Sequence, residues 1–565
     1  MKTNEELNHI TNEVIKLLQH KNYQEVLKFE KEFDMDVLED TKLLYLFGTN
    51  RLALDQLNLA ENYLLKSIEI DNKLVHALTN LGILYERQDK NEDALKFHKM
   101  CIKTNPNHYD GQYNIGSFYA KQENYKDAIK HYKIALKFNK NINLLKNLTL
   151  AYTSLDDDKN ALKFNDMAIE LDRNDIELLN RKANILIKLN KFEEAIDIFK
   201  KLIKSNSNLP ELYFNLGVAY KGLDEIEKEI GCYESALKID PNYPEANHNL
   251  GLYLLRNKNF KEGWEKYEYR MDPKLLDPIK KPNTTLPFWS LNEIDSRLFV
   301  WPEQGVGDCI FFSSLLPELK SHCQSLTCAV DKRLVSIFQR SMPNIKFIPS
   351  DAEVFSNQFD HQLAIGSIPK FFRNNLKDFE KTPISYLKAD LKKSLELEKE
   401  IKNTGKFTIG ISWKSKSTVE KRKTINLVNL INSMKIPAKF VNLQYGEVDQ
   451  EIKEVKEKTG VDIIKCKSLD IYNDLDGLAS LMCACDVVIS IPNVNQTIAS
   501  ALGIPTFLLV SNNPTFRWTT HGIDNIWHPN TKVFRQTPEG DWQKPINELS
   551  QVIINLIMQL YQKQA

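Results

Sequence analysis

Two patterns of apolar and polar positions divide the chain. Up to about residue 272, apolar residues recur at the helical spacing of three to four, in segments separated by short polar turns. From residue 296 on, short apolar runs alternate with segments of helical spacing. The first pattern predicts an array of helix pairs, and the second predicts α/β units built on parallel strands.

The helical half repeats along its length. An aromatic or apolar residue follows a small residue by three positions, as at Tyr85, and alanine follows it by twelve, as at Ala94. This pattern resembles the tetratricopeptide repeat, and residues 5–272 are expected to form a superhelix of seven to eight repeats. The small residues recur at steps of 34, with one step of 33: Gly48, Gly82, Gly116, Thr149, Ala183, Gly217 and Gly251.

Asparagine stands two positions before the small residue in most repeats. Equivalent positions of successive repeats form a line along the concave surface, where side-chain amides pair with the backbone of an extended peptide. We therefore expect a protein or peptide partner in this groove, although asparagine is also common at this position for structural reasons. The expected groove residues are Asn80, Asn114, Asn147, Asn215 and Asn249.

A proline-rich segment follows the repeats. Trp264 and Tyr267 in the last helix predict that this helix packs on something other than another repeat. Four prolines within 15 residues then indicate a linker over 273–295: Pro273, Pro278, Pro282 and Pro287.

The second half is expected to contain two α/β units and a final helix. Residues 296–402 form the first Rossmann-like unit, 403–545 the second, and the amphipathic segment 546–563 a C-terminal helix. Ligands of such units bind at the carboxyl ends of the strands. The predicted strands are 297–301, 325–330, 345–350, 407–413, 438–444, 461–466, 486–492 and 506–510. The predicted helices between them are 309–320, 333–342, 390–402, 425–434, 448–459, 475–485 and 494–502.

Several stretches of this half resemble a known family. They are "WPEQGVGDCIFFSSLLPELK", "GISWKSKS", "FVNLQYG", "DLDGLASLMCACDVVIS", "ALGIPTFLLV" and "RWTTHGIDNIWHPNTKVFRQ". The chain resembles bacterial tetratricopeptide proteins with a C-terminal GT-B glycosyltransferase domain. The region is similar to heptosyltransferases and, in architecture, to protein O-GlcNAc transferase. The resemblance implies transfer of a sugar from a nucleotide-diphosphate donor to a hydroxyl of a protein, peptide or glycan, without a metal or a resident cofactor.

The acceptor side is expected in the first unit. A glycine-rich turn between strand and helix lets a substrate approach the backbone closely. In the heptosyltransferases, the aspartate that matches Asp308 deprotonates the acceptor hydroxyl, so the resemblance makes Asp308 the catalytic base. The alternative for Asp308 is a helix N-cap. The other expected acceptor-side residues are Glu303, Gln304, Gly305, Gly307 and His361.

The donor side is expected in the second unit. Lysine or arginine after the strand "GISW", and free amides at the helix that follows "DVVISIP", would both stabilise a leaving diphosphate. The alternative for the basic segment is a solvated loop. The expected donor-binding residues are Trp413, Lys414, Lys416, Arg422, Gln444, Asp476, Asn493, Asn495 and Thr497.

Two features favour interpretations other than sugar transfer or metal binding. Thr497 stands where related sequences have a histidine, which favours a second hypothesis, a catalytically degenerate platform that serves protein interactions. Asp474 and Asp476 open a predicted helix, so capping is favoured over a metal-binding motif. A third hypothesis is another nucleotide-sugar enzyme of the same fold, such as an epimerase.

Composition narrows the remaining classes. Lys+Arg and Asp+Glu are both 75, which gives no electrostatic case for nucleic acid as a partner. The N-terminus is polar, and no apolar run approaches the roughly 18 residues of a membrane helix. The eight cysteines form no CxxC pair, so we expect free thiols in a reducing cytoplasm.

Overall fold

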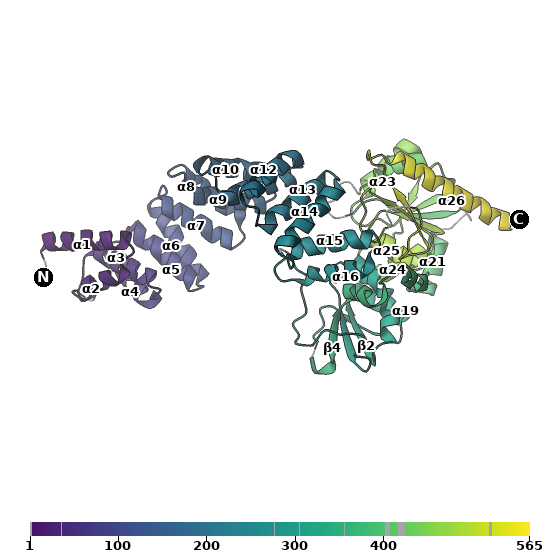
Figure 1. The fold of residues 1–565 in the computed structure, drawn as a ribbon, viewed down its shortest axis with the longest axis horizontal. Helices are drawn as coiled ribbons and strands as arrows, with labels where there is room; N and C mark the ends of the chain where they lie inside the picture. The colour runs from purple at the N-terminus through teal and green to yellow at the C-terminus, as the bar shows by residue number, and fades with distance from the viewer. Residues whose placement is uncertain are drawn as a thin grey trace. The chain divides into compact units, whose positions relative to one another are not determined.

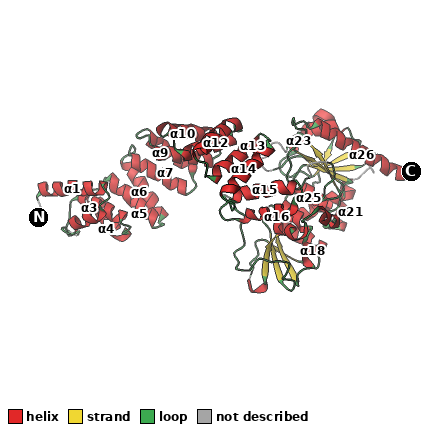
Figure 2. Cartoon of the chain, viewed as in Figure 1, coloured by secondary structure: helices red, strands yellow, loops and turns green. Residues whose placement is uncertain are grey.

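The computed structural model describes residues 3–35, 37–275, 277–303, 305–354, 356–401, 407–415, 424–518 and 522–564. The chain forms two compact units, Met1–Cys232 and Tyr233–Ala565 (Figure 1). Helices make up the described part of the first unit, whereas the second unit also contains two groups of strands (Figure 2).

The first unit is a row of helix pairs in which each helix packs on its neighbours in sequence. α14 (Ile226–Ile239) begins in this unit and ends in the second. The preceding helices are α1 (Asn4–Gln19), α2 (Tyr23–Glu30), α3 (Thr41–Ala53), α4 (Leu57–Ile70), α5 (Val75–Arg87), α6 (Asn91–Thr104), α7 (Tyr109–Lys121), α8 (Tyr125–Leu136), α9 (Ile142–Ser154), α10 (Asp158–Leu171), α11 (Ile176–Lys188), α12 (Phe192–Ser205) and α13 (Pro210–Gly222).

The small residue of each repeat lies where the two helices of a pair meet. A Cβ added to Gly82 would lie 2.4 Å from the His98 ring, and one added to Gly116 would lie 2.7 Å from the Tyr132 ring. Ala94 is fully buried, as the repeat pattern predicts, but the atoms nearest Gly82 belong to His98. The small residue is therefore needed because the second helix occupies the position of its side chain, with a ring at Gly82 and Gly116 and with Leu64 at Gly48.

A second periodic feature lies in the turn between the helices of each pair. One residue in each of these turns has the left-handed backbone conformation, with φ between 54° and 65°. None of these residues is glycine, although a side chain is unfavourable in this conformation. They are Lys21, Asp55, Asp89, Glu123, Asp156, Asn190, Asp224 and Lys258.

The last helix pair belongs to the second unit. It consists of α15 (Pro244–Arg256) and α16 (Phe260–Tyr267), followed by the 3-10 turn η1 (Glu268–Met271). Trp264 of α16 is 1% exposed, and its Nε1 donates to the carbonyl of Arg373 at 2.7 Å. Its ring lies edge-on to Trp527, with 6.0 Å between centroids. The last helix therefore packs into the α/β core, which confirms the expectation from its aromatic residues.

The first sheet has four parallel strands in the order β3-β2-β1-β4. The strands are β1 (Arg297–Trp301), β2 (Ser325–Val330), β3 (Lys346–Pro349) and β4 (His361–Ala364). The sequence pattern did not predict β4. The expected helix over 309–320 is two helices, α17 (Val306–Ser313) and α18 (Leu316–Lys320), because Pro317 lacks the N–H that would continue the first helix. The remaining helices of this part are α19 (Val335–Ser341), α20 (Pro369–Phe372) and α21 (Leu391–Ile401).

The second sheet has six parallel strands in the order β10-β9-β8-β5-β6-β7. The strands are β5 (Thr408–Ser412), β6 (Lys439–Asn442), β7 (Ile463–Ile464), β8 (Val487–Ser490), β9 (Thr506–Val510) and β10 (Thr531–Arg535), of which β10 was not predicted. The helices are α22 (Leu427–Met434), α23 (Asp449–Thr459), α24 (Leu475–Cys483), α25 (Val494–Ala501) and α26 (Gln543–Gln564). These sheets confirm α/β architecture for this half.

One apolar core joins the two sheets. It contains Leu298 of β1, Phe311 of α17, Ala479 of α24, Ile498 of α25 and Trp264 of the last repeat. A separate core on the other face of the six-stranded sheet contains Ile411 of β5 and Ile553 of α26. The C-terminal helix therefore packs on the second sheet rather than across both parts.

The proline-rich segment predicted as a linker is part of this unit. Gln362 of β4 donates its backbone N–H to Pro287 at 2.9 Å and accepts the N–H of Trp289 at 2.9 Å. Trp289 is 3% exposed. The segment therefore covers the free edge of β4, where unpaired backbone groups would otherwise remain.

Candidate active site

Both sheets reverse their strand order beside their first strand. β2 and β4 flank β1 in the first sheet, and β6 and β8 flank β5 in the second. In open α/β sheets, ligands bind outside the carboxyl ends of the strands at such a point. The loops after β1, β4, β5 and β8 are therefore the place to look for a site.

Asp308 follows β1 and lies in the first turn of α17. Gly305 occupies the N-cap position, and no side chain caps this helix. Asp308 is therefore not a helix N-cap, which was the alternative to a catalytic role. Its carboxylate instead accepts a hydrogen bond from Nη2 of Arg517, and its side chain is 26% exposed.

Arg517 lies in the segment between β9 and β10, and sequence reasoning missed it. Its guanidinium carbon lies 4.6 Å from the centroid of the Phe311 ring and 5.9 Å from that of Phe516. The side chain is 20% exposed. Arg517 is thus a cation held on aromatic rings beside Asp308, a geometry in which planar guanidinium groups stack favourably.

Glu303 precedes the glycine-rich turn and is held from two sides. Its Oε1 accepts from Nη2 of Arg270 at 2.6 Å and from the Gly366 N–H at 2.7 Å, and its Oε2 accepts from Nε of Arg270 at 2.8 Å. The Glu303 side chain is only 5% exposed. This carboxylate holds the start of the turn against Arg270 and Gly366. Its burial corrects the expectation that Glu303 faces the acceptor.

The two glycines of the turn relieve no close contact with the residues that the structure describes. Among those residues, a Cβ at Gly305 would meet nothing within 4 Å, and one at Gly307 would meet Thr497 Oγ1 at 3.8 Å and the Val494 Cα at 3.9 Å. Neither residue has positive φ. Their lack of side chains therefore leaves open space in front of the turn instead of relieving a contact or a strained backbone.

The other two expected acceptor-side residues do not join this group. His361 is the first residue of β4, at the end of the strands opposite to Asp308, and its Nδ1 lies 3.0 Å from the Ser296 hydroxyl. This position corrects the expectation that His361 lies on the acceptor side of the first Rossmann-like unit, residues 296–402. Gln304 lies outside the described residues.

Polar side chains form a buried network at the carboxyl ends of β5, β6 and β8. Gln444 is 1% exposed, and its Oε1 accepts from the Ser412 hydroxyl at 2.9 Å and from the Lys414 N–H at 2.9 Å. Ser412 accepts from the amides of Asn493 at 2.8 Å and Asn495 at 3.1 Å. Asn493 is the N-cap of α25 and accepts from the Gln496 N–H. The network fixes the loop after β5 against the start of α25.

This network brings together Gln444, Asn493 and Asn495, three of the expected donor-side residues. The Thr497 hydroxyl donates to the Asn493 carbonyl at 3.3 Å, so it lies in the same first turns of α25. Since Gly307 faces Thr497 and α17 packs on α25, the Asp308 turn of the first sheet meets the α25 end of the second.

The predicted basic segment is only partly described. Lys416 and Arg422 lie outside the described residues. Lys414 is described, and its Nζ forms an ion pair with Glu451 of α23 at 3.0 Å. Trp413 is 1% exposed, and its Nε1 donates to the same carboxylate at 2.8 Å. Both side chains therefore point to α23.

The "DLD" aspartates serve structural contacts. Asp474 caps α24 by accepting the Gly477 N–H at 2.7 Å, which confirms the capping interpretation for this residue. Asp476 accepts from Nη2 of Arg340 at 2.6 Å and from the Ser336 hydroxyl at 3.0 Å. This pairing to α19 corrects the assignment of Asp476 to the donor.

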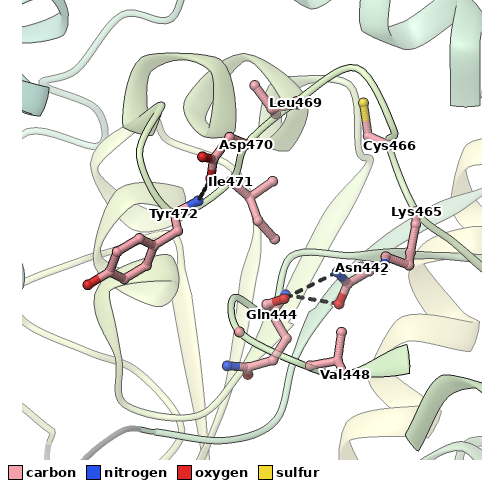
Figure 3. A pocket seen from close by; sticks show the side chains of 10 residues that line it. Asn442, Gln444, Val448, Lys465, Cys466, Leu469, Asp470, Ile471 and Tyr472 are labelled. Atoms are coloured by element: carbon pink, nitrogen blue, oxygen red, sulfur yellow. Dashed lines mark hydrogen bonds between the residues drawn. The ribbon is translucent and has the colours of Figure 1, made fainter. Parts of the chain in front are cut away.

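A cavity of about 230 Å³ opens beside the buried network (Figure 3). Gln444 forms part of its wall, together with Asn442, Lys465, Ile471 and Tyr472. Asn442 and Gln444 hydrogen-bond each other along one side, and the Tyr472 ring projects at the other (Figure 3). The lining of the cavity thus includes amides, an ammonium group, an aromatic ring and the apolar side chains of Val448, Leu469 and Ile471.

The repeat asparagines bridge neighbouring first helices. The amide of Asn80 donates to Thr49 at 2.8 Å, that of Asn147 to the Tyr113 hydroxyl at 3.0 Å, and that of Asn215 to Asn180 at 3.1 Å. Asn114 is half-buried on α7. In the second unit, Asn249 donates to the Tyr233 hydroxyl at 3.3 Å. These bonds use donor groups of the amides, so the ladder also has a structural role.

Comparisons agree with the repeat architecture. Residues 77–108, 109–142, 210–243 and 232–265 match the family described as tetratricopeptide repeat, and residues 183–224 match TPR repeat. Two solved structures are similar to part of the chain. YrrB, titled a TPR protein with an unusual peptide-binding site, is 25% identical over 34% of this chain and 98% of its own, with a TM-score of 0.32. MamA from Desulfovibrio magneticus RS-1 is 22% identical over 28% of this chain and 91% of its own, with a TM-score of 0.26.

A curated relative also matches. Over 313 residues, the chain is 30% identical to Protein FlbA of Caulobacter vibrioides, which covers 51% of this chain and 51% of that protein. The match thus spans about half the length of the relative.

In the described parts, no helix has the length and hydropathy needed to cross a membrane. All eight cysteines are free thiols.

Proposed function

We propose that the protein is a GT-B glycosyltransferase that moves a sugar from a nucleotide-diphosphate donor to a hydroxyl of a protein, peptide or glycan. The observation that carries the proposal is the meeting of α17 and α25, which places Gly307, the residue before Asp308, beside Thr497 and Val494 at the start of α25. A transferase needs a base for the acceptor and a donor site close to it, and these come from different sheets.

The cavity supports a nucleotide on the second sheet. An apolar cavity of about 150 Å³ holds a benzene molecule, so about 230 Å³ has room for a nucleobase. Tyr472 provides a ring for stacking, and Asn442 provides an amide for hydrogen bonding. In this proposal, the base occupies the cavity and the diphosphate extends towards α25.

The repeats recruit the acceptor or a partner protein. Helix-pair repeats of this kind present an extended surface suited to peptides. The asparagines that bridge neighbouring repeats keep their carbonyl oxygens for a peptide N–H, because the bonds described above use the amide donors. The protein is placed in the cytoplasm in this proposal, where free thiols persist.

The second candidate is a degenerate platform that serves protein interactions. Two observations favour it: Thr497 stands where related enzymes have histidine, and Lys414 is paired with Glu451. In this alternative the α/β half only supports the repeats.

Donor binding followed by transfer separates the two candidates. Thermal unfolding of the full chain is measured with UDP-, GDP- and ADP-sugars, and a bound donor raises the midpoint by mass action. Asp308→Asn is then expected to abolish transfer and to retain donor binding. No shift with any donor would contradict the transferase and favour the platform. Consumption of donor without an acceptor would indicate hydrolysis or epimerisation.

A further inference from the structure

Arg517 is a cation at the meeting point of the two sheets that the proposed function does not yet use. We propose that Arg517 binds the diphosphate of the donor and that Asp308 is its counter-ion until the donor arrives, so that donor binding frees the Asp308 carboxylate for the acceptor. This inference rests on the proposed function and adds an order to it: donor first, acceptor second.

The first argument is the fixed position of the guanidinium. Phe311, Phe312 and Phe516 lie within 4.6–5.9 Å of its central carbon, so the aromatic rings hold the group in one place. The backbone is held as well, because the Arg517 carbonyl accepts from the amide of Asn525 at 2.9 Å. A guanidinium fixed in this way binds a phosphate with little loss of side-chain entropy.

The second argument is the balance of charge around the group. The amino-terminal ends of α17 and α25 meet here, and each carries partial positive charge. The first turn of α17 contains Asp308 as its acidic residue, and the first turn of α25 contains none. Among the described contacts of Arg517 and these two helix ends, Asp308 is the one carboxylate, an arrangement that favours a ligand with more than one negative charge.

The third argument is the position of Lys414, the described member of the expected phosphate-binding cations. Lys414, the expected phosphate ligand, is paired with Glu451 and also donates to the Glu447 carbonyl at 3.2 Å. Arg517 pairs instead with the residue that the proposed reaction requires as a base. While the Asp308 carboxylate accepts a hydrogen bond from Arg517, it is not free to accept the proton of the acceptor hydroxyl. A diphosphate that binds the guanidinium in place of Asp308 releases the carboxylate.

The chemical step balances with these groups. The Asp308 carboxylate takes the proton of the acceptor hydroxyl, and the acceptor oxygen forms a bond to the anomeric carbon of the sugar. The bond from that carbon to the diphosphate oxygen breaks, and its electron pair leaves with the nucleoside diphosphate. The Arg517 guanidinium stabilises the charge that develops on this leaving group.

The test measures binding of ADP, UDP and GDP, with the matching nucleosides, to the full chain by calorimetry. Arg517→Met is expected to weaken binding of the preferred diphosphate about 10- to 100-fold, the range for charged hydrogen bonds, and to leave nucleoside binding unchanged. Arg517→Lys keeps the charge without the planar fork and is expected to lie between the two. Arg340→Met is the matched control, since it breaks another Arg–Asp pair, with Asp476, away from this site.

A double-mutant cycle tests the counter-ion. Asp308→Asn is expected to tighten diphosphate binding several-fold, because the guanidinium no longer has a competing carboxylate, and this gain should vanish in the Arg517→Met background. A role limited to folding would change the melting temperature without this coupling.

Each outcome decides one assignment. Equal diphosphate binding by wild type and both Arg517 variants would overturn the inference and leave the proposed function standing. Weaker binding in Asp308→Asn would overturn the counter-ion assignment. No binding of any diphosphate by the wild type would overturn the proposed function, and the inference with it.

Discussion

Arg270 and Glu303 form a buried ion pair that ties the end of the last repeat to the turn that carries Asp308. Two hydrogen bonds of 2.6 and 2.8 Å join the guanidinium to the carboxylate, and the side chains are 3% and 5% exposed. Burial alone would lower the pKa of Arg270, but the hydrogen bonds and charge of Glu303 raise it above its ordinary value. The repeats therefore contribute a charged residue to the scaffold of the candidate active site.

Arg270→Met should destabilise the second unit strongly. Removal of Arg270 leaves the buried Glu303 carboxylate without its cation, which costs about 3–5 kcal/mol in comparable buried pairs, and it also removes the partner of the partly exposed Glu268. Denaturant unfolding of the full chain measures the loss. Arg297→Met is the control, because its pair with Asp360 is nearly half exposed, so its loss is expected to cost far less than the loss of the buried pair. Equal effects of the two substitutions would contradict the structural role of Arg270.

Gly307→Ala should separate stability from activity. Glycine within a helix is less stable than alanine by about 0.5–1 kcal/mol, and the new Cβ would make only ordinary contacts with Thr497 and Val494. The free energy of unfolding is therefore expected to rise. Under the proposed function, the same methyl group enters the space in front of Asp308, and transfer is expected to fall at least tenfold. Unchanged transfer would show that no substrate approaches this turn.

Tyr472→Ala should weaken nucleotide binding if the cavity holds the base. Stacking of a base on an aromatic ring is worth about 1–3 kcal/mol, which corresponds to roughly 5- to 150-fold in affinity. Calorimetry with the preferred nucleoside measures the change. Tyr269→Ala, which removes a tyrosine of the 3-10 turn η1, is the control and should bind as the wild type does. Loss in both variants would point to a general effect on folding.

His528 should make stability depend on pH. Burial, with a contribution from the charge of Arg517, lowers the pKa of His528 from 6.5 to about 3. Between these values the unfolded chain binds a proton that the folded chain does not, so the free energy of unfolding falls as the pH drops below about 6.5. The slope from one such group is about 1.4 kcal/mol per pH unit. His528→Phe should reduce the dependence by this amount between pH 4 and 6, and parallel curves for both proteins would refute the assignment.

Glu123→Gly should stabilise the first unit. Glu123 has φ of 58°, a conformation that costs a residue with a side chain about 1–2 kcal/mol, whereas glycine adopts it freely. The greater freedom of glycine in the unfolded chain offsets part of the gain, so an increase of up to about 1 kcal/mol is expected. Thermal unfolding measures it against Glu123→Ala, which keeps the strained backbone and should give no gain.

Local patterns in the sequence were sufficient for most elements. The period of 34 residues placed the helix pairs, and apolar runs placed β1, β2 and β9 at their observed bounds. β4 (HQLA) and β10 (TKVFR) were missed because each strand mixes polar with apolar residues and forms no continuous apolar run. The left-handed turns repeat as well, at steps of 34 with one step of 33, as at Asp55 and Asp89.

The candidate site was less predictable. Asp474 was correctly assigned as a cap, because capping depends on the few residues that follow. Glu303 and Asp476 were assigned to substrates because their partners, Arg270 and Arg340, lie on other elements. Arg517 is the first residue of the stretch "RWTTHGIDNIWHPNTKVFRQ", but no local pattern indicated which carboxylate it would contact.

The sequence by itself determined the repeat, the alternation of strands and helices, and the glycine-rich turn before Asp308, since each depends on spacing along the chain. Only the tertiary structure decided which charges face one another. Asp308 and Arg517 are separated by 209 residues, and their contact depends on strand order and on the packing of α17 against α25. Local periodicity records which face of an element is buried, but not which distant element covers it.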